Sequence, residues 1–393
     1  MTNTPLELFY SNINYGQPDL KNIWDAIYIN ANSELKFQID IARKFGKNRL
    51  VARNGCWNTP WAQKIIPEFE MPSTDEKFSK SFTQITNERS EEIRQVILNS
   101  ESQRIVVLYS GGIDSTICLS SLIQNLNKEE LSRVDICMSS ESIVENPIFY
   151  DKFIKGKFNI LDSALFNYQE IEAAGNIALT SDLGDSIFGT ELGNEFYLKH
   201  SDLNPEDSFL KHSDKIIQFF NLNSSLQFSK IFYQRLIENI NTAKIDIFSI
   251  HDFFWWYIFN LKYMDCALRG PVFYHYGDTN REKTIKENIL HWFNTTDYQK
   301  WSLTNNNNGQ KIRGNSAATY KWAGRQYIYQ FDKSEWQFRY KLKISSLINI
   351  SYRTKNRNMS KNIFALDSKF NLISINSPEF RSLINNQADC HNT

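Results

Sequence analysis

The stretch RIVVLYSGGIDSTICLSSLIQN, residues 104–125, decides the expected fold. Its apolar, β-branched beginning predicts a buried strand, and its apolar end predicts a helix. Between the two lies the turn SGGIDS, residues 110–115. Glycines let the chain turn sharply and let an anion approach the backbone, and the positive end of a helix dipole favours negative charge there. The stretch therefore predicts a strand–turn–helix unit suited to phosphate.

This turn differs from two common phosphate loops. It lacks the lysine that follows the glycines in GxxxxGK[ST], and it does not have the spacing GxGxxG. It offers instead the hydroxyl groups of Ser110, Ser115 and Thr116, close in sequence to backbone N–H groups at a helix start. Such a set of donors favours phosphate binding over a purely structural glycine turn.

The flanking segments extend the unit into an alternating pattern. Apolar residues recur at helical spacing from 78 to about 99, after an N-cap expected at Ser73 or Thr74. Two more short apolar runs predict strands, and one intervening segment predicts a helix; these are VDICMS (134–139), NIALTS (176–181) and IVENPIFYDKFIKG (143–156). Strands alternating with helices predict an α/β fold, a parallel twisted sheet with helices on both faces.

The chain divides by composition into three expected parts. Residues 1–75 are aromatic-rich and of uncertain fold, and residues 76–192 form the expected nucleotide-binding core. Residues 193–393 have a mainly helical pattern, with a polar loop at 302–318 and short alternating stretches compatible with a terminal hairpin. The cluster FFWWYIF, residues 253–259, is expected to be core.

Composition excludes several classes of function. Lys+Arg and Asp+Glu both number 44 among 393 residues, so the basic excess of a duplex-binding protein is missing and no DNA partner is expected. The five cysteines contain no CxxC pair, which argues against zinc, iron–sulfur and disulfide frameworks. The start of the chain lacks a signal-peptide pattern, and no apolar run is long enough to span a membrane. We expect a soluble, cytoplasmic protein.

The turn SGGIDS resembles the SGGxDS signature of the PP-loop ATP pyrophosphatases of the N-type group. This resemblance implies a HUP or Rossmann-like PP-loop domain that cleaves ATP between the α- and β-phosphates. It implies that Asp114 helps to place Mg²⁺ and that adenine lies against the end of the second strand, at Met138. The residues that it implies for holding the leaving pyrophosphate are Ser110, Gly111, Gly112, Asp114, Ser115 and Thr116.

A second stretch, IALTSDLGDSIFGT at 177–190, resembles the strand and loop of asparagine-synthetase-type synthetases. The resemblance implies that Asp182, in place of the catalytic Glu of that family, acts as a carboxylate base or orients an amine. It implies that Asp185 joins Asp114 on Mg²⁺–pyrophosphate. The sequence departs from the family pattern at two positions, because it has Asp182 where the family has Glu and Ser186 where the family has an acid. These departures concern the identity of the substrate.

In the same synthetases a lysine from the C-terminal part contacts the phosphate of the adenylate and stabilises charge in the transition state. The candidates in this sequence are Lys262, Lys311, Lys321 and Arg325. Lys321 is favoured because it follows the polar loop, which is a candidate lid. For each of them the alternative is a solvated surface cation.

The resemblance implies an ATP- and Mg²⁺-dependent ligase that forms AMP and pyrophosphate. It would adenylate a small-molecule carboxylate and form an amide with ammonia or an amine. Position 2 is Thr, not the catalytic Cys of a glutaminase domain, so a separate glutaminase or another nitrogen source is expected. Two alternatives stay open: a tRNA-modifying PP-loop enzyme of lysidine synthetase or thiolase type, and a nucleotide-binding protein without turnover.

Overall fold

The computed structural model describes residues 52–53, 70–73, 77–99, 103–163, 171, 174–189, 193, 196–197, 199–220, 226–264, 266–267, 287–307, 321–339, 341–343, 364–366 and 372–374. Contacts divide the chain into two compact units. The sheet unit comprises Lys80–Asp182, Lys286–Trp292 and Ile312–Thr393, and the aromatic unit comprises Met1–Ser79, Leu183–Ile285 and Phe293–Lys311. This division is not consecutive along the chain, unlike the three expected parts. The expected region 1–75 lies almost entirely outside the described residues.

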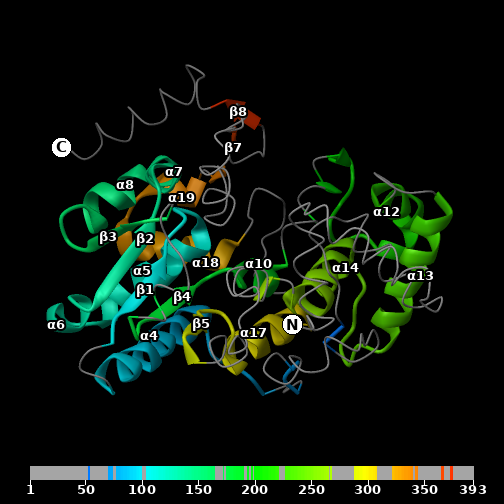
Figure 1. The fold of residues 1–393 in the computed structure, drawn as a ribbon. Coiled ribbons are helices and arrows are strands. Elements are labelled where there is room, and N and C mark those ends of the chain that lie inside the picture. The colour runs from blue at the N-terminus through cyan, green and yellow to red at the C-terminus, as the bar shows by residue number, and fades with distance from the viewer. Residues whose placement is uncertain are drawn as a thin grey trace, which may run out of the picture. The chain divides into compact units, whose positions relative to one another are not determined.

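A five-stranded parallel sheet forms the centre of the sheet unit, which confirms the expected α/β class (Figure 1). Its order is β3-β2-β1-β4-β5. The strands are β1 (Ile105–Leu108), β2 (Val134–Met138), β3 (Asn159–Asp162), β4 (Ile177–Thr180) and β5 (Ile289–His291). Every residue of β2 and β4 is buried, so both faces of the central strands are covered.

The helices of the sheet unit pack against one another as well as on the sheet. The elements are α4 (Phe82–Leu98), α5 (Ile113–Asn125), α6 (Lys128–Leu131), α7 (Ser140–Glu145), α8 (Pro147–Phe149), the π-helical turn η2 (Tyr150–Ile154), α18 (Trp322–Asp332) and α19 (Glu335–Arg339). One apolar cluster joins β2, α5, α8, η2 and the residue that follows β1; its buried members are Tyr109, Leu119, Ile136, Met138, Phe149 and Ile154.

Two local boundaries differ from expectation. The first helix begins at Phe82, and its N-cap is Ser81 rather than Ser73 or Thr74, because the Ser81 hydroxyl accepts the Gln84 N–H at 3.1 Å. The helix expected over 143–156 is broken at Asn146, whose backbone (φ −144°, ψ 75°) is not helical. The following residue is Pro147, and a proline disfavours the helical conformation of the residue before it.

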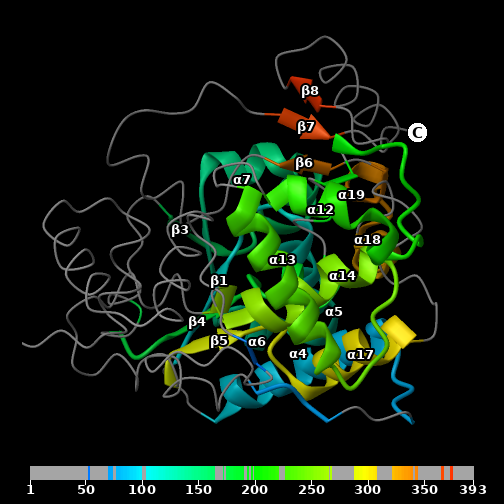
Figure 2. The same ribbon diagram turned by 90° about the vertical axis from the view of Figure 1, so that its right-hand side faces the viewer.

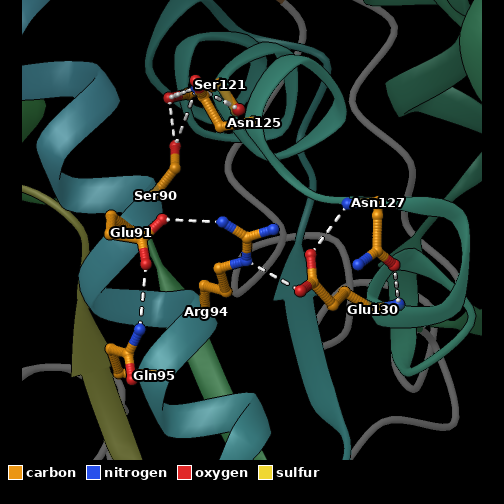
Figure 3. Close-up of polar contacts among 8 residues, drawn as sticks. All are labelled: Ser90, Glu91, Arg94, Gln95, Ser121, Asn125, Asn127 and Glu130. Carbon is orange, nitrogen blue, oxygen red and sulfur yellow. Dashed lines mark hydrogen bonds and ion pairs between the residues drawn. The ribbon is translucent and has the colours of Figure 1, made fainter.

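A polar network fixes α4 against α5 and α6 (Figure 3). Figure 3 shows Ser90 of α4 facing Ser121 and Asn125 of α5, where the two serine hydroxyls are hydrogen-bonded. Arg94 donates to Glu130 of α6 at 2.7 Å. Because most of these polar groups are buried or half-buried and bonded, they favour one arrangement of the three helices.

Helix α18 is held on the same pair of helices although it lies more than 200 residues later in the chain. The Tyr327 hydroxyl donates to Asn87 Oδ1 at 2.7 Å, and the Tyr327 ring meets the Phe82 ring edge-on at a centroid distance of 6.3 Å. Since Asn87 and Phe82 belong to α4, these two contacts set the middle of α18 relative to α4 by direct packing.

The aromatic unit is helical. Its elements are α10 (Gly184–Phe188), the 3-10 helix η3 (Phe209–His212), α12 (Ser213–Phe220), α13 (Leu226–Asn241), α14 (Ile250–Trp256), the π-helical turn η4 (Tyr257–Lys262) and α17 (Thr296–Asn307). All of residues 253–259 are buried, which confirms their expected place in the core. Figure 2 shows α12, α13 and α14, three of the helices that contribute buried aromatic residues to this core. No helix within the described part of the chain has the length and apolarity to span a membrane.

The C-terminal strands form a small antiparallel sheet of order β6-β7-β8, with β6 (Lys341–Lys343), β7 (Phe364–Leu366) and β8 (Leu372–Ser374). The antiparallel pairing of β7 with β8 agrees with the expected terminal hairpin. The polar loop expected from residue 302 starts later, because α17 continues to Asn307, and Trp301 and Leu303 anchor it in the core. Residues 308–318 of that loop lie outside the described residues.

Candidate functional site

The order of the strands defines a switch point between β1 and β4. Strands β2 and β3 lie on one side of β1, whereas β4 and β5 lie on the other side. The connections that follow β1 and β4 therefore leave in opposite directions, and ligands of open parallel sheets bind outside the carboxyl ends of such strands. The turn 110–115 follows β1, and Asp182 follows β4. Because β1 and β4 are adjacent and parallel, the glycine turn and Asp182 both lie at the carboxyl-terminal ends of the strands.

The first glycine of the turn is required by conformation and by space. Gly111 has φ +80°, a value that side chains other than glycine rarely adopt. A Cβ atom at this position would lie 2.3 Å from the carbonyl oxygen of Ser142 in α7. Gly112 is the N-cap of α5 with φ −73°, and a Cβ atom there would lie 3.1 Å from Glu145 Oε1. The chain thus turns in close contact with α7.

The hydroxyl groups of the turn bond to its own backbone. The Ser115 hydroxyl accepts the Ser110 N–H at 3.2 Å and donates to the Gly112 carbonyl at 3.1 Å. Thr116 donates to the same carbonyl at 2.9 Å and is fully buried. The Ser110 hydroxyl accepts the Gly112 N–H in a longer contact of 3.3 Å. Ser115 and Thr116 therefore shape the turn, and Ser110 is half-buried.

The structure joins Asp114 with Lys321, two residues singled out in the sequence and 207 positions apart. The Lys321 ammonium donates to Asp114 Oδ2 and forms an ion pair with it. The Lys321 side chain is 3% exposed and that of Asp114 is 18% exposed. Lys321 also has φ 51°, a left-handed backbone that is unfavourable for a non-glycine residue. Lys321 is the N-cap of α18, and a strained, buried lysine paired with a carboxylate in the first turn of α5 is energetically costly, which points to a functional constraint.

The other cation candidates lie elsewhere. Arg325 is buried, and its guanidinium donates to the Phe338 carbonyl at 3.2 Å, so it joins α18 to α19. Lys262 is buried in the aromatic unit, within η4. Lys311 lies outside the described residues.

The short helix α19 contributes contacts that the sequence did not indicate. Gln337 Nε2 donates to the Gly111 carbonyl oxygen at 2.6 Å. Next to it, Trp336 Nε1 donates to the Glu145 carbonyl at 2.9 Å. The segment 321–339 therefore contacts the glycine turn through Lys321 and Gln337 and contacts α7 through Trp336. Neither Trp336 nor Gln337 belongs to a recognisable motif.

The remaining predicted residues are distributed as follows. Asp182 is half-buried, and its N–H donates to Thr180 Oγ1 at 3.3 Å. Asp185 is half-buried in the first turn of α10, in the aromatic unit. Met138 is buried in the apolar cluster, and its carbonyl accepts the Ser163 N–H at 3.0 Å. The Met138 side chain is therefore part of the core.

Acidic groups near the turn are also buried. Glu145 is 2% exposed, with Oε1 near Gly112 as described above. Burial raises the pKa of Asp332 in α18 to about 6, although a hydrogen bond from the Ser334 N–H partly opposes the shift. Burial also raises the pKa of the Tyr109 hydroxyl, with smaller contributions from Glu145 and Asp332.

The residues at the turn fit a phosphate group better than a metal ion bound by protein alone. The 13-residue helix α5 directs its N-terminus at the turn, and a lysine ammonium lies beside it. Among the described residues no group of three or more His, Cys, Asp or Glu side chains is arranged to hold a metal. Mg²⁺ is commonly held by one or two carboxylates together with substrate phosphates, so Asp114 is compatible with that role once phosphate is bound.

Comparisons with known protein families, with characterised proteins and with solved structures found no match for this chain.

Proposed function

We propose that this chain is an ATP-dependent ligase that forms AMP and pyrophosphate. It adenylates a small-molecule carboxylate and then forms an amide with ammonia or an amine, supplied free or by a separate glutaminase. One observation carries the proposal: a glycine turn at the switch point of a parallel sheet, with Asp114 and the buried Lys321 paired at the start of α5.

Lys321 has the strongest support as a phosphate ligand. Its ammonium is withdrawn from water and fixed by the packing of α18 on α4 and α5. A cation held in advance at a low-dielectric position stabilises developing negative charge without rearrangement. On this proposal Lys321 moves its ammonium from Asp114 to the oxygens of the pyrophosphate that leaves.

The turn and the carboxylates take complementary roles. Gly111 and Gly112 present the backbone to pyrophosphate, and Ser110 adds a hydroxyl. Asp114 would hold Mg²⁺, which when bound neutralises phosphate charge. Asp182 would orient the amine or take its proton. The backbone near Met138 would contact adenine.

The proposal is tested by the products of ATP cleavage. The full chain is incubated with Mg-ATP, ammonia and a panel of amino acids and other carboxylates, and nucleotides and amides are identified by mass spectrometry. AMP with pyrophosphate, dependent on one acid, is expected. ADP with phosphate, or no cleavage despite ATP binding, would contradict the ligase. AMP formed only when tRNA is added would favour the tRNA-modifying alternative.

Two variants assign the roles. Asp114→Ala is expected to abolish pyrophosphate release, whereas the matched control Asp151→Ala, whose side chain is 65% exposed, should keep it. Asp182→Asn should slow amide formation more than pyrophosphate release. If Asp182→Asn leaves both steps unchanged, the role proposed for this carboxylate is wrong.

A further inference from the structure

The glycine turn is fixed from two sides by groups outside it. On one side the Ser142 carbonyl oxygen lies 2.3 Å from the position that a Cβ atom of residue 111 would take. A second constraint comes from Gln337 of α19, whose Nε2 donates to the Gly111 carbonyl at 2.6 Å across 226 positions of sequence. The peptide between Gly111 and Gly112 therefore has little freedom to rotate.

The direction of that peptide matters for anion binding. A trans peptide is planar, and its C=O and N–H bonds point in opposite directions. Gln337 holds the Gly111 carbonyl, so the N–H of Gly112 is turned away from α19. Within the described part of the chain, the hydrogen bond that this N–H donates is the 3.3 Å contact with the Ser110 hydroxyl. A long contact of this kind is readily exchanged for a charged acceptor.

We infer that Gln337 is a positioning residue that turns the Gly112 N–H towards pyrophosphate, an inference that rests on the proposed function. Gln337 acts through the Gly111 peptide and does not itself touch the anion. Without its amide, that peptide can rotate and direct a carbonyl oxygen, instead of an N–H, at the phosphate.

The hydrogen bonding of Gln337 supports a functional reason for a glutamine at this position. The residue is 5% exposed, and its Oε1 atom has no hydrogen-bond partner among the described residues. The opposite orientation of the amide would place Oε1 against the Gly111 carbonyl, oxygen against oxygen. A glutamine retained for stability alone would be expected to satisfy both ends of its amide. This one satisfies the end that faces the turn.

The test uses inorganic pyrophosphate as the probe and calorimetric titration of the full chain. Gln337→Glu replaces the donor by a carboxylate of almost the same shape. At pH 8 we expect this variant to lose at least tenfold in affinity relative to wild type. As the pH falls, the carboxyl gains a proton and can donate again, so the ratio of the two affinities should return towards one. Gln337→Met should lose affinity without this recovery.

The controls separate positioning from folding. Gln326→Glu adds the same charge at an exposed position of α18 and should bind as wild type does. Circular dichroism checks that each variant is folded, and Gln337→Met carries the test if Gln337→Glu is not. Wild-type affinity in both Gln337 variants would overturn the inference while leaving the proposed function intact. So would equal losses with no dependence on pH. Absence of pyrophosphate binding by wild type would overturn both.

Discussion

The pair Lys321–Asp114 allows a quantitative prediction about stability. The proposed perturbations are Asp114→Asn, Lys321→Met and the double variant. Breaking a buried ion pair by removing one partner costs about 3–5 kcal/mol, because a charge is left in a poorly solvated place. The remaining charge differs between the variants: the Lys321 side chain is 3% exposed and the Asp114 side chain is 18% exposed. Asp114 also lies in the first turn of α5, where the helix dipole favours a carboxylate by about 0.3–1 kcal/mol.

The two single variants should therefore be unequal. We expect Asp114→Asn to lower the free energy of unfolding by about 4 kcal/mol and Lys321→Met by about 3 kcal/mol. The double variant should fall short of the sum by about 2–3 kcal/mol, since neither charge is left behind. The assay is urea unfolding at pH 7, monitored by circular dichroism. The transition midpoints are compared between variants whose unfolding free energy depends equally on urea concentration. Additive effects, or a larger loss for Lys321→Met, would refute the reasoning.

Three further predictions concern single side chains. Gly111→Ala should lower the melting temperature by several degrees because its Cβ atom would lie 2.3 Å from the Ser142 carbonyl at φ +80°; an unchanged melting temperature would contradict this contact. The pKa of Asp332 is raised from 3.8 to about 6, so folding favours the protonated carboxyl. Its contribution to the free energy of unfolding is therefore full below pH 4 and is lost as the pH rises through 6. Asp332→Asn should thus add about 3 kcal/mol at pH 7 and almost nothing at pH 4 in urea unfolding; a gain independent of pH would exclude the carboxylate as its cause. Gly189→Ala should destabilise the aromatic unit, because a Cβ atom would lie 2.4 Å from the Trp255 ring at φ +66°, and intrinsic fluorescence during heating would detect the loss.

The parts of the fold that local sequence determines were predicted well. Strand β1, the glycine turn and α5 follow directly from an apolar run, two glycines and a second apolar run. Strands β2 and β4 also have continuous apolar sequences. Strand β3 was missed because its four residues are exposed or half-buried at the edge of the sheet. Strand β5 was missed because it has only three residues and joins the sheet more than 100 positions after β4.

The candidate site was predicted only in part, because some of its contacts join residues that are far apart in the sequence. The residues of the turn lie together in the sequence, so their proximity needed no tertiary information. Lys321 was favoured among four cations because of a neighbouring polar loop, and no local pattern indicates its contact with Asp114. Gln337 has no sequence signal at all, since one amide in a five-residue helix has neither periodicity nor spacing. Such contacts depend on long-range packing of α18 and α19.

The distance along the chain between the glycine turn and its partners has a consequence for biosynthesis. Gly111 leaves the ribosome 226 residues before Gln337 does. At about 5–20 residues per second, roughly 10–45 s pass between the two events. Within that interval, after Thr180 and before Ile289 has been made, the nascent chain carries the turn and strands β1 to β4 but lacks β5, α18 and α19. In this window the edge of β4 that pairs with β5 is uncovered, and a chain truncated after β4 would lack the hydrogen bond from Gln337 to the glycine turn.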